Sequence, residues 1–168
     1  MKKNILLLSV VLGIAALVVA AEEAKTNDKS QQASSTEHRV LNPSDLTWGD
    51  MPPGLPVGAK MAVLNGNPGA AGPFTARMNA PAGYTIAPHT HPTTERITVI
   101  SGSFRVGMGT TFSESNMKDL GPGSYIVLPS GMAHFAKVTT DSIIQIDSEG
   151  PFQINYVNPA DDPRGAKK

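Results

Sequence analysis

Three of the chain's four histidines are candidates for one metal site, and two of them form the pair His89-Thr90-His91. On a β-strand, residues i and i+2 project from the same face about 7 Å apart, so two imidazoles at this spacing can converge on one ion. Pro92 ends that strand, and a short turn after it would bring the carboxylate of Glu95 back toward the same point. His134 would be the distant fourth ligand.

The composition limits which metal chemistry is available. Because the chain has no cysteine, disulfides, thiolate catalysis and cysteine-ligated zinc, haem or iron-sulfur sites are excluded. Imidazole and carboxylate ligands suit Fe(II), Mn(II), Ni(II), Cu(II) or Zn(II), and the general affinity order does not choose among them. We therefore expect one divalent metal ion of open identity. The alternative is that these histidines are core or surface residues without a metal, which would leave buried polar side chains without partners.

The elements that must position these side chains are expected to be strands. The chain is rich in turn formers, with 16 glycines and 14 prolines, and this favours an all-β sandwich or barrel. From Arg39 onward, short apolar alternations are separated by Gly, Pro and Asn clusters, without a sustained helical period. One helical turn is expected at residues 42–46, capped by Asn42 with Pro43 at its first position. The sequence predicts strands at residues 62–64, 74–80, 84–89, 95–100, 103–108, 124–128, 134–138, 142–147 and 152–156.

At these residues the sequence resembles the cupin family. The first cupin motif is a glycine, five residues, His-x-His, three or four residues, Glu, six residues and glycine, and it is matched without a gap by Gly83, His89, His91, Glu95 and Gly102. The second motif is matched by Gly123, Pro129, Gly131 and His134. Its last position differs, since Val138 stands where the family has asparagine. This asparagine is not a ligand, so the departure weakens the match only slightly.

The resemblance implies a fold and a site. It implies a single-domain cupin barrel, the double-stranded β-helix or jelly roll, preceded by the short helical turn. It also implies a metal site inside that barrel formed by three histidines and one glutamate, namely His89, His91, Glu95 and His134, which agrees with the ligand types deduced above. Cupins often dimerise through sheet edges, so a homodimer is implied as well.

The strand period also predicts what surrounds the site. Side chains two apart on a strand share a face, so Ile97 and Val99 should face inward with Glu95. No second carboxylate, lysine or free histidine in these strands can be assigned as a general base. The other residues expected to face inward, or to border the mouth of a pocket, are Phe104, Val106, Met108, Tyr125, Met132, Phe135, Ala136 and Val138. For Phe104, Val106, Met108, Tyr125, Met132 and Phe135, ordinary packing is a readier interpretation than contact with a substrate.

The first part of the chain is expected to serve export. Residues 1–21 have a basic start, an apolar run and small residues at the end, the pattern of a bacterial secretory signal peptide. Residues 22–38 lack large apolar side chains and are expected to be a flexible linker to the barrel, residues 39–168. We therefore expect a periplasmic or secreted protein without a stable membrane anchor after cleavage. The alternative, an uncleaved anchor, requires a longer apolar run.

Three functions remain open at this stage. The first is a mononuclear-metal oxidoreductase, similar to a dioxygenase, that acts on a small organic molecule. The second is a non-catalytic module that senses or binds a metal or small ligand, and the third is a metal-dependent isomerase or hydrolase. The formal net charge of zero gives no attraction for nucleic acid, which excludes that class of partner.

Overall fold

The computed structural model describes residues 38–165. The predicted signal peptide, residues 1–21, and all of the predicted linker except His38 lie outside the described residues. The described residues lie in one compact unit. Within residues 38–165, no helix is long and apolar enough to cross a membrane.

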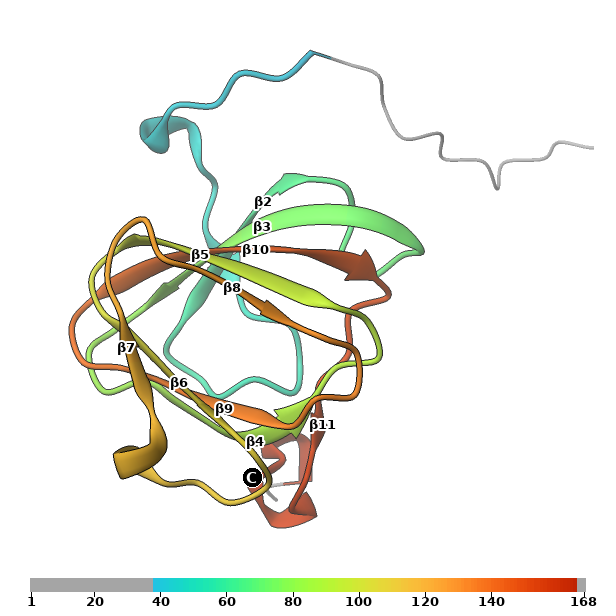
Figure 1. The fold of residues 1–168 in the computed structure, drawn as a ribbon. Coiled ribbons are helices and arrows are strands. Elements are labelled where there is room, and N and C mark those ends of the chain that lie inside the picture. Colours follow the sequence, from blue (N-terminus) through green and yellow to red (C-terminus); the bar gives the residue numbers. More distant parts are fainter. Residues whose placement is uncertain (1–37, 166–168) are drawn as a thin grey trace, which may run out of the picture. The chain divides into compact units, whose positions relative to one another are not determined.

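Two antiparallel sheets enclose the interior of this unit (Figure 1). The six-stranded sheet has the order β1-β2-β3-β10-β5-β8. Its strands are β1 Gly49–Asp50, β2 Lys60–Asn65, β3 Gly72–Ala80, β10 Ser142–Gly150, β5 Glu95–Ser101 and β8 Tyr125–Leu128. The five-stranded sheet has the order β11-β4-β9-β6-β7. Its strands are β11 Asn155–Tyr156, β4 Thr85–Thr90, β9 His134–Val138, β6 Phe104–Met108 and β7 Lys118–Leu120.

The helical content of the described residues consists of single 3-10 turns. They are η1 Pro43–Asp45, η2 Glu114–Asn116, η3 Pro159–Asp161 and η4 Pro163–Gly165. The first of them lies where the sequence predicts it, with Asn42 as its N-cap residue and Pro43 in its first turn. The all-β class is therefore confirmed.

Each of the nine predicted strand segments overlaps a strand in the structure. Two further strands, β1 and β7, were not predicted, because each is short and carries no alternating apolar pattern. The last predicted strand, residues 152–156, is wrong at its start: only Asn155 and Tyr156 pair with β4. Phe152 instead turns its ring toward the interior, where it packs edge to face against Phe74.

The core lies between the inner faces of the two sheets. In β3 the alternation predicted from the sequence is seen directly, since the side chains of Phe74, Ala76, Met78 and Ala80 are almost completely buried. Ile97 and Val99 on β5 face the same interior. Burial of these side chains contributes about 1.5–3 kcal/mol for each large one, which makes the inner faces the main source of stability.

Candidate metal centre

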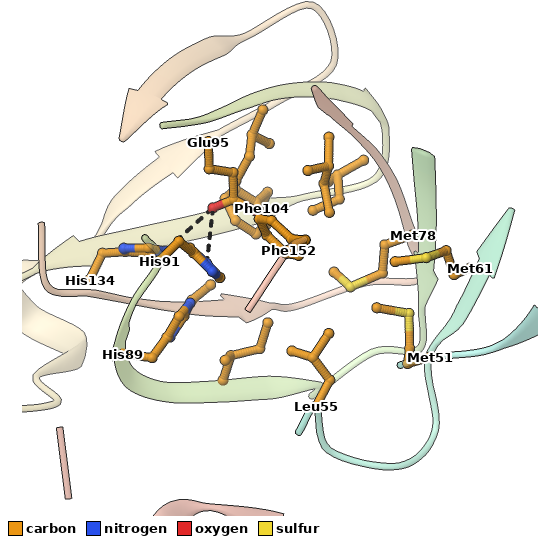
Figure 2. Close-up of a pocket in the computed structure, with 15 residues that line it drawn as sticks. Met51, Leu55, Met61, Met78, His89, His91, Glu95, Phe104, His134 and Phe152 are labelled. Carbon is orange, nitrogen blue, oxygen red and sulfur yellow. Dashed lines mark ion pairs between the residues drawn. The ribbon is translucent and has the colours of Figure 1, made fainter. Parts of the chain in front are cut away.

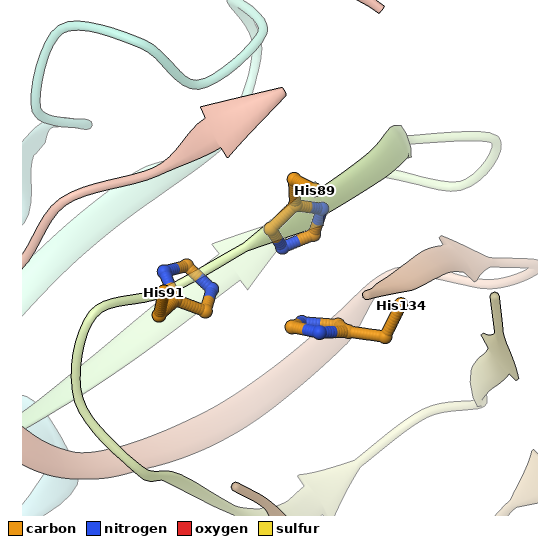
Figure 3. Close-up of side chains that lie close together, drawn as sticks. All are labelled: His89, His91 and His134. Atoms are coloured by element: carbon orange, nitrogen blue, oxygen red, sulfur yellow. The ribbon is translucent and has the colours of Figure 1, made fainter. Parts of the chain in front are cut away.

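The four predicted ligands come from both sheets and from the connection between them. His89 on β4 and His134 at the start of β9 lie directly opposite each other in the five-stranded sheet. Glu95 is the first residue of β5, in the six-stranded sheet, and His91 lies in the connection that leads from β4 to β5. Figures 2 and 3 show their side chains directed toward a common centre.

An irregularity in β4 turns His89 inward. Ile86 and His89 both line the interior cavity, although residues three apart on a regular strand face opposite sides of a sheet. The register between β4 and β9 shifts between these two residues, as in a β-bulge, and Pro88 lies within the shift. Because proline has no N–H to give to a neighbouring strand, it is suited to such a position. The bulge thus allows an apolar residue and a histidine to share one face.

Hydrogen bonds join the loop that carries His91 to the loop that precedes His134. The Gly131 N–H donates to the His91 carbonyl oxygen at 2.9 Å, and the Ser130 hydroxyl donates to the Pro92 carbonyl oxygen at 2.6 Å. Gly131 has a φ of 74°, the left-handed conformation that favours glycine in a tight turn. The loop that aims His134 is therefore fastened to the loop that carries His91.

The side-chain geometry places a compact set of metal-ligating atoms inside the protein. One ring nitrogen from each of His89, His91 and His134 lies within 4.8 Å of the others. The Glu95 Oε2 atom lies 3.5 Å from the Nε2 atoms of both His91 and His134. All four residues are at most 5% exposed. The structure thus brings together the four residues predicted from the sequence, and metal binding by them stays a prediction.

The backbone fixes which ring nitrogen faces this centre. Nδ1 lies 2.7 Å from the Ala87 carbonyl oxygen in His89, 2.6 Å from that of Gln153 in His91 and 3.0 Å from that of Met132 in His134. A carbonyl oxygen only accepts hydrogen bonds, so each Nδ1 carries the ring proton. In a neutral ring, Nε2 then presents a lone pair. Nε2 is therefore the ring nitrogen that each histidine can offer to a metal ion.

The protonation states follow from burial and from the neighbouring groups. Burial lowers the pKa of His89 to about 3, and it lowers the pKa of His91 as well. Burial alone would raise the pKa of Glu95, but a hydrogen bond with His134 and the electrostatic influence of the His91, His134 and His89 rings outweigh it and leave this pKa lowered. At neutral pH, Glu95 is thus ionised while the rings of His89 and His91 are neutral.

These residues fit a divalent cation. A buried carboxylate beside three imidazole rings favours a bound cation, because a charge removed from water needs a partner of opposite charge. An ion bound between the three Nε2 atoms and Glu95 would satisfy all four groups at once. Nitrogen and carboxylate oxygen ligands, with each histidine held at Nδ1 by a carbonyl oxygen, are typical of such sites in proteins.

Phe152 supports the His91 ring by stacking on it. Its ring stacks on the His91 ring with centroids 4.4 Å apart and planes inclined by 20°. The next residue, Gln153, accepts the hydrogen bond from His91 Nδ1. This support was not predicted, since residues 152–156 were assigned to a strand and nothing in the sequence relates them to His91.

The centre lies in the wall of a small cavity of about 30 Å³. Ile97, Phe104 and Ala136 line it as the strand period predicts. The other lining residues were not predicted as such, because they come from strands and loops far away in the sequence. They are Met51, Leu55, Met61, Met78, Ile86, Ile144, Ile146 and Phe152.

Several predictions about the surroundings are corrected by the structure. Met108, the last residue of β6, is 45% exposed and does not line the cavity. None of the three residues expected at the mouth lines the cavity: Tyr125 and Met132 are exposed, and Phe135 is fully buried beside Phe112. Val106 and Val138 are buried in the core as expected, but away from the cavity.

Comparisons with known proteins agree with this architecture. The family model described as a domain of unknown function, DUF4437, matches residues 13–156. Among curated proteins, a germin-like protein of Arabidopsis thaliana, subfamily T member 3, is 46% identical over 57 residues, which are 33% of this chain and 25% of that protein. The chain therefore spans only about a quarter of that relative's length.

Solved structures show the same fold. The polyketide cyclase RemF from Streptomyces resistomycificus superposes with a TM-score of 0.63 at 18% identity, covering 76% of this chain and 91% of its own. An acetylacetone dioxygenase from Acinetobacter johnsonii gives 0.58 at 19%, covering 79% and 85%. An RmlC-like cupin from Shewanella frigidimarina gives 0.52 at 18%, covering 67% and 91%. At such low identity these likenesses establish the fold and nothing about activity.

Proposed function

The chain belongs to the DUF4437 family and has the cupin fold, and from this premise we propose that it is a mononuclear-metal oxidoreductase, similar to a dioxygenase, that acts on a small organic molecule. His89, His91, Glu95 and His134 hold the metal. The observation that carries this proposal is the convergence of three imidazole nitrogens and one carboxylate at a single point of a cavity wall.

The surroundings of the centre support chemistry that depends on the metal. Every cavity-lining side chain outside the four ligands is apolar, so none of them can serve as a general acid or base. A bound ion supplies what they lack, namely Lewis acidity and an open position for a chelating substrate or dioxygen. The chain's own residues hold the ligands rigidly, exclude water with aliphatic walls and leave the face toward the cavity free.

Metal reconstitution with oxygen-uptake measurements tests the proposal. The metal-free protein is loaded in turn with Fe(II), Mn(II), Ni(II), Cu(II) and Zn(II), and its metal content is measured by elemental analysis. Each form is then assayed for oxygen uptake with catechol and with acetylacetone, the compound after which the Acinetobacter johnsonii dioxygenase is named. We expect one ion per chain and uptake with at least one redox-active metal. The His91→Ala/His134→Ala double variant is the control, and it should neither bind the ion nor take up oxygen.

A non-catalytic binding module is the second candidate. The absence of an acid or base among the lining side chains favours it as well, because a module that only binds a metal or small ligand needs none. Stoichiometric metal binding without turnover by any reconstituted form would favour this candidate. Oxygen uptake that depends on the four ligands would exclude it.

We also propose that the protein is exported. The support is the sequence of residues 1–21, which lie outside the described part of the structure. Expression in a bacterial host should yield a periplasmic form whose N-terminus lies at or beside Glu22. A chain that retains Met1 and stays in the cytoplasm would contradict the proposal.

A further inference from the structure

The cavity has two ends of different chemical character. His89, His91, Glu95 and His134 occupy one end, and Figure 2 shows Met51, Met61 and Met78 gathered at the other. Met61 and Met78 are register partners on neighbouring strands, β2 and β3, so their side chains lie next to each other on the inner face of the sheet. Met51 approaches them from the segment between β1 and β2. A thioether accepts hydrogen bonds only weakly, so this end offers a polar group no firm partner.

The segment between β1 and β2 closes the methionine end. Its residues Met51 and Leu55 line the cavity, and two tyrosines hold its backbone in place. The Tyr84 hydroxyl donates to the Pro56 carbonyl oxygen at 2.7 Å, and the Tyr156 hydroxyl donates to that of Gly54 at 2.8 Å. Burial raises the pKa of Tyr84, so its hydroxyl keeps the proton that it donates. The segment is therefore fixed to the barrel.

This arrangement restricts what can occupy the cavity. A carboxylate, amine or hydroxyl at the methionine end would lose its water without gaining a partner, which is costly. A methyl or methylene group would be favoured there, since it exchanges water for apolar walls. Methionine side chains also adapt to irregular shapes. The cavity itself is small, about 30 Å³, which restricts the tail to a short one.

We propose that the site takes small molecules with a chelating group at one end and a short, uncharged, apolar tail at the other, and that Met51 and Leu55 help to select that tail. The proposal excludes sugars, dicarboxylates and amino acids as substrates. It rests on the proposed function only in that the polar end binds the metal. The preference for an apolar tail belongs to the cavity itself.

Two hydroxamates that differ in one group test the proposal on the zinc-loaded protein. Butanohydroxamic acid and succinic monohydroxamic acid share the chelating group, but the terminal methyl of the first is a carboxylate in the second. Calorimetric titration should give butanohydroxamic acid at least about 10-fold tighter binding, because an unpaired carboxylate is disfavoured in an apolar site. Equal binding, or tighter binding of the succinic compound, would overturn the proposal while leaving metal binding intact.

A substitution with a matched control tests the role of the segment. Met51 is only partly buried, so Met51→Gln should fold and place an amide in the apolar end. We expect butanohydroxamic acid to bind about 3- to 10-fold more weakly to this variant, with no loss for the succinic compound. Met108→Gln makes the same chemical change at an exposed position outside the cavity and should change neither affinity. Equal effects of the two substitutions would refute the role of Met51.

A metal-free arm separates this inference from the proposed function. In protein labelled with ¹³C at the methionine methyl groups, benzene should shift the Met51, Met61 and Met78 signals, while exposed Met108 and Met132 serve as internal controls. Benzoate at the same concentration should leave all of them in place. If none of the five metals binds, the proposed function is wrong and this arm alone decides the inference. Shifts confined to the exposed methionines, or equal shifts with benzoate, would overturn it.

Discussion

Replacing Glu95 by glutamine should have opposite effects on the stability of the metal-free protein and on metal binding. The change removes one buried negative charge and keeps the shape of the side chain. In the wild-type protein, Glu95 Oε2 lies 3.5 Å from the Nε2 atoms of His91 and His134, and both rings direct their Nδ1 proton to a backbone carbonyl oxygen. An amide N–H₂ at the same place could donate one hydrogen bond to each ring.

The magnitudes follow from these contacts. Each new hydrogen bond contributes about 0.5–1.5 kcal/mol, and the cost of a buried charge is removed as well. We therefore expect the free energy of unfolding of metal-free Glu95→Gln to exceed that of metal-free wild type by about 1–3 kcal/mol. Metal affinity should fall by at least about 10- to 100-fold, the loss typical even of groups that only support a ligand.

Two assays on the same samples measure the two effects. Urea unfolding of protein dialysed against chelator gives the stability of the metal-free state, and competition with a fluorescent zinc chelator gives the affinity. Glu149→Gln is the matched control, because Glu149 is exposed on β10, and it should change neither quantity. If Glu95→Gln lowered the stability of the metal-free protein and left zinc affinity unchanged, the cluster would be an ion pair between protonated histidines and a carboxylate. Our assignment would then be wrong.

Three further predictions concern the support of the site. Phe152→Leu should weaken zinc binding by about 10-fold in the competition assay, because stacking on His91 is lost. The control is Phe112→Leu, which removes a ring that packs against Phe135 and should leave the zinc affinity unchanged. Because burial lowers the pKa of His89 to about 3, below its value of about 6.5 in the unfolded chain, unfolding takes up protons between these values. The free energy of unfolding of the metal-free protein should thus fall by up to about 1.4 kcal/mol per pH unit because of His89 as the pH falls from about 6.5 toward 3. A free energy of unfolding that stays constant over this range in urea titrations would contradict the burial of His89 as a neutral ring. Gly54→Ala should lower the free energy of unfolding by about 1–3 kcal/mol in the urea assay, because Gly54 has a φ of 103° and a Cβ there would lie 2.9 Å from Ile154 Cγ2. The control is Gly121→Ala, where a Cβ meets no atom within 4 Å, and it should lower this free energy less.

The fold and the candidate ligands could be predicted because their signals are local. Alternation in β3 and β5 shows directly in the burial of Phe74, Met78 and Ile97, and turn residues such as Gly131 mark where the chain must reverse. His89, His91 and Glu95 place three of the four candidate ligands within seven residues of sequence. Short strands without an alternating pattern, such as β1 and β7, leave no comparable trace.

The cavity could not be predicted, because it depends on contacts between distant segments. Leu55 reaches the interior only because tyrosine hydroxyls fix the backbone around it. Phe152 supports His91 across sixty residues of sequence. The bulge at Pro88 also changes which side chains face inward, so strict alternation alone would place Ile86 and His89 on opposite faces. Such effects arise from packing between elements and have no local periodicity.

X-ray absorption at the zinc edge tests the central claim most directly. For the zinc-loaded protein we predict one ion per chain, bound by nitrogen and oxygen at about 2.0–2.2 Å, with the outer-shell scattering of three imidazoles. The His91→Ala/His134→Ala double variant should lose the ion. Zinc that binds without imidazole scattering, or that binds equally to the double variant, would contradict the account.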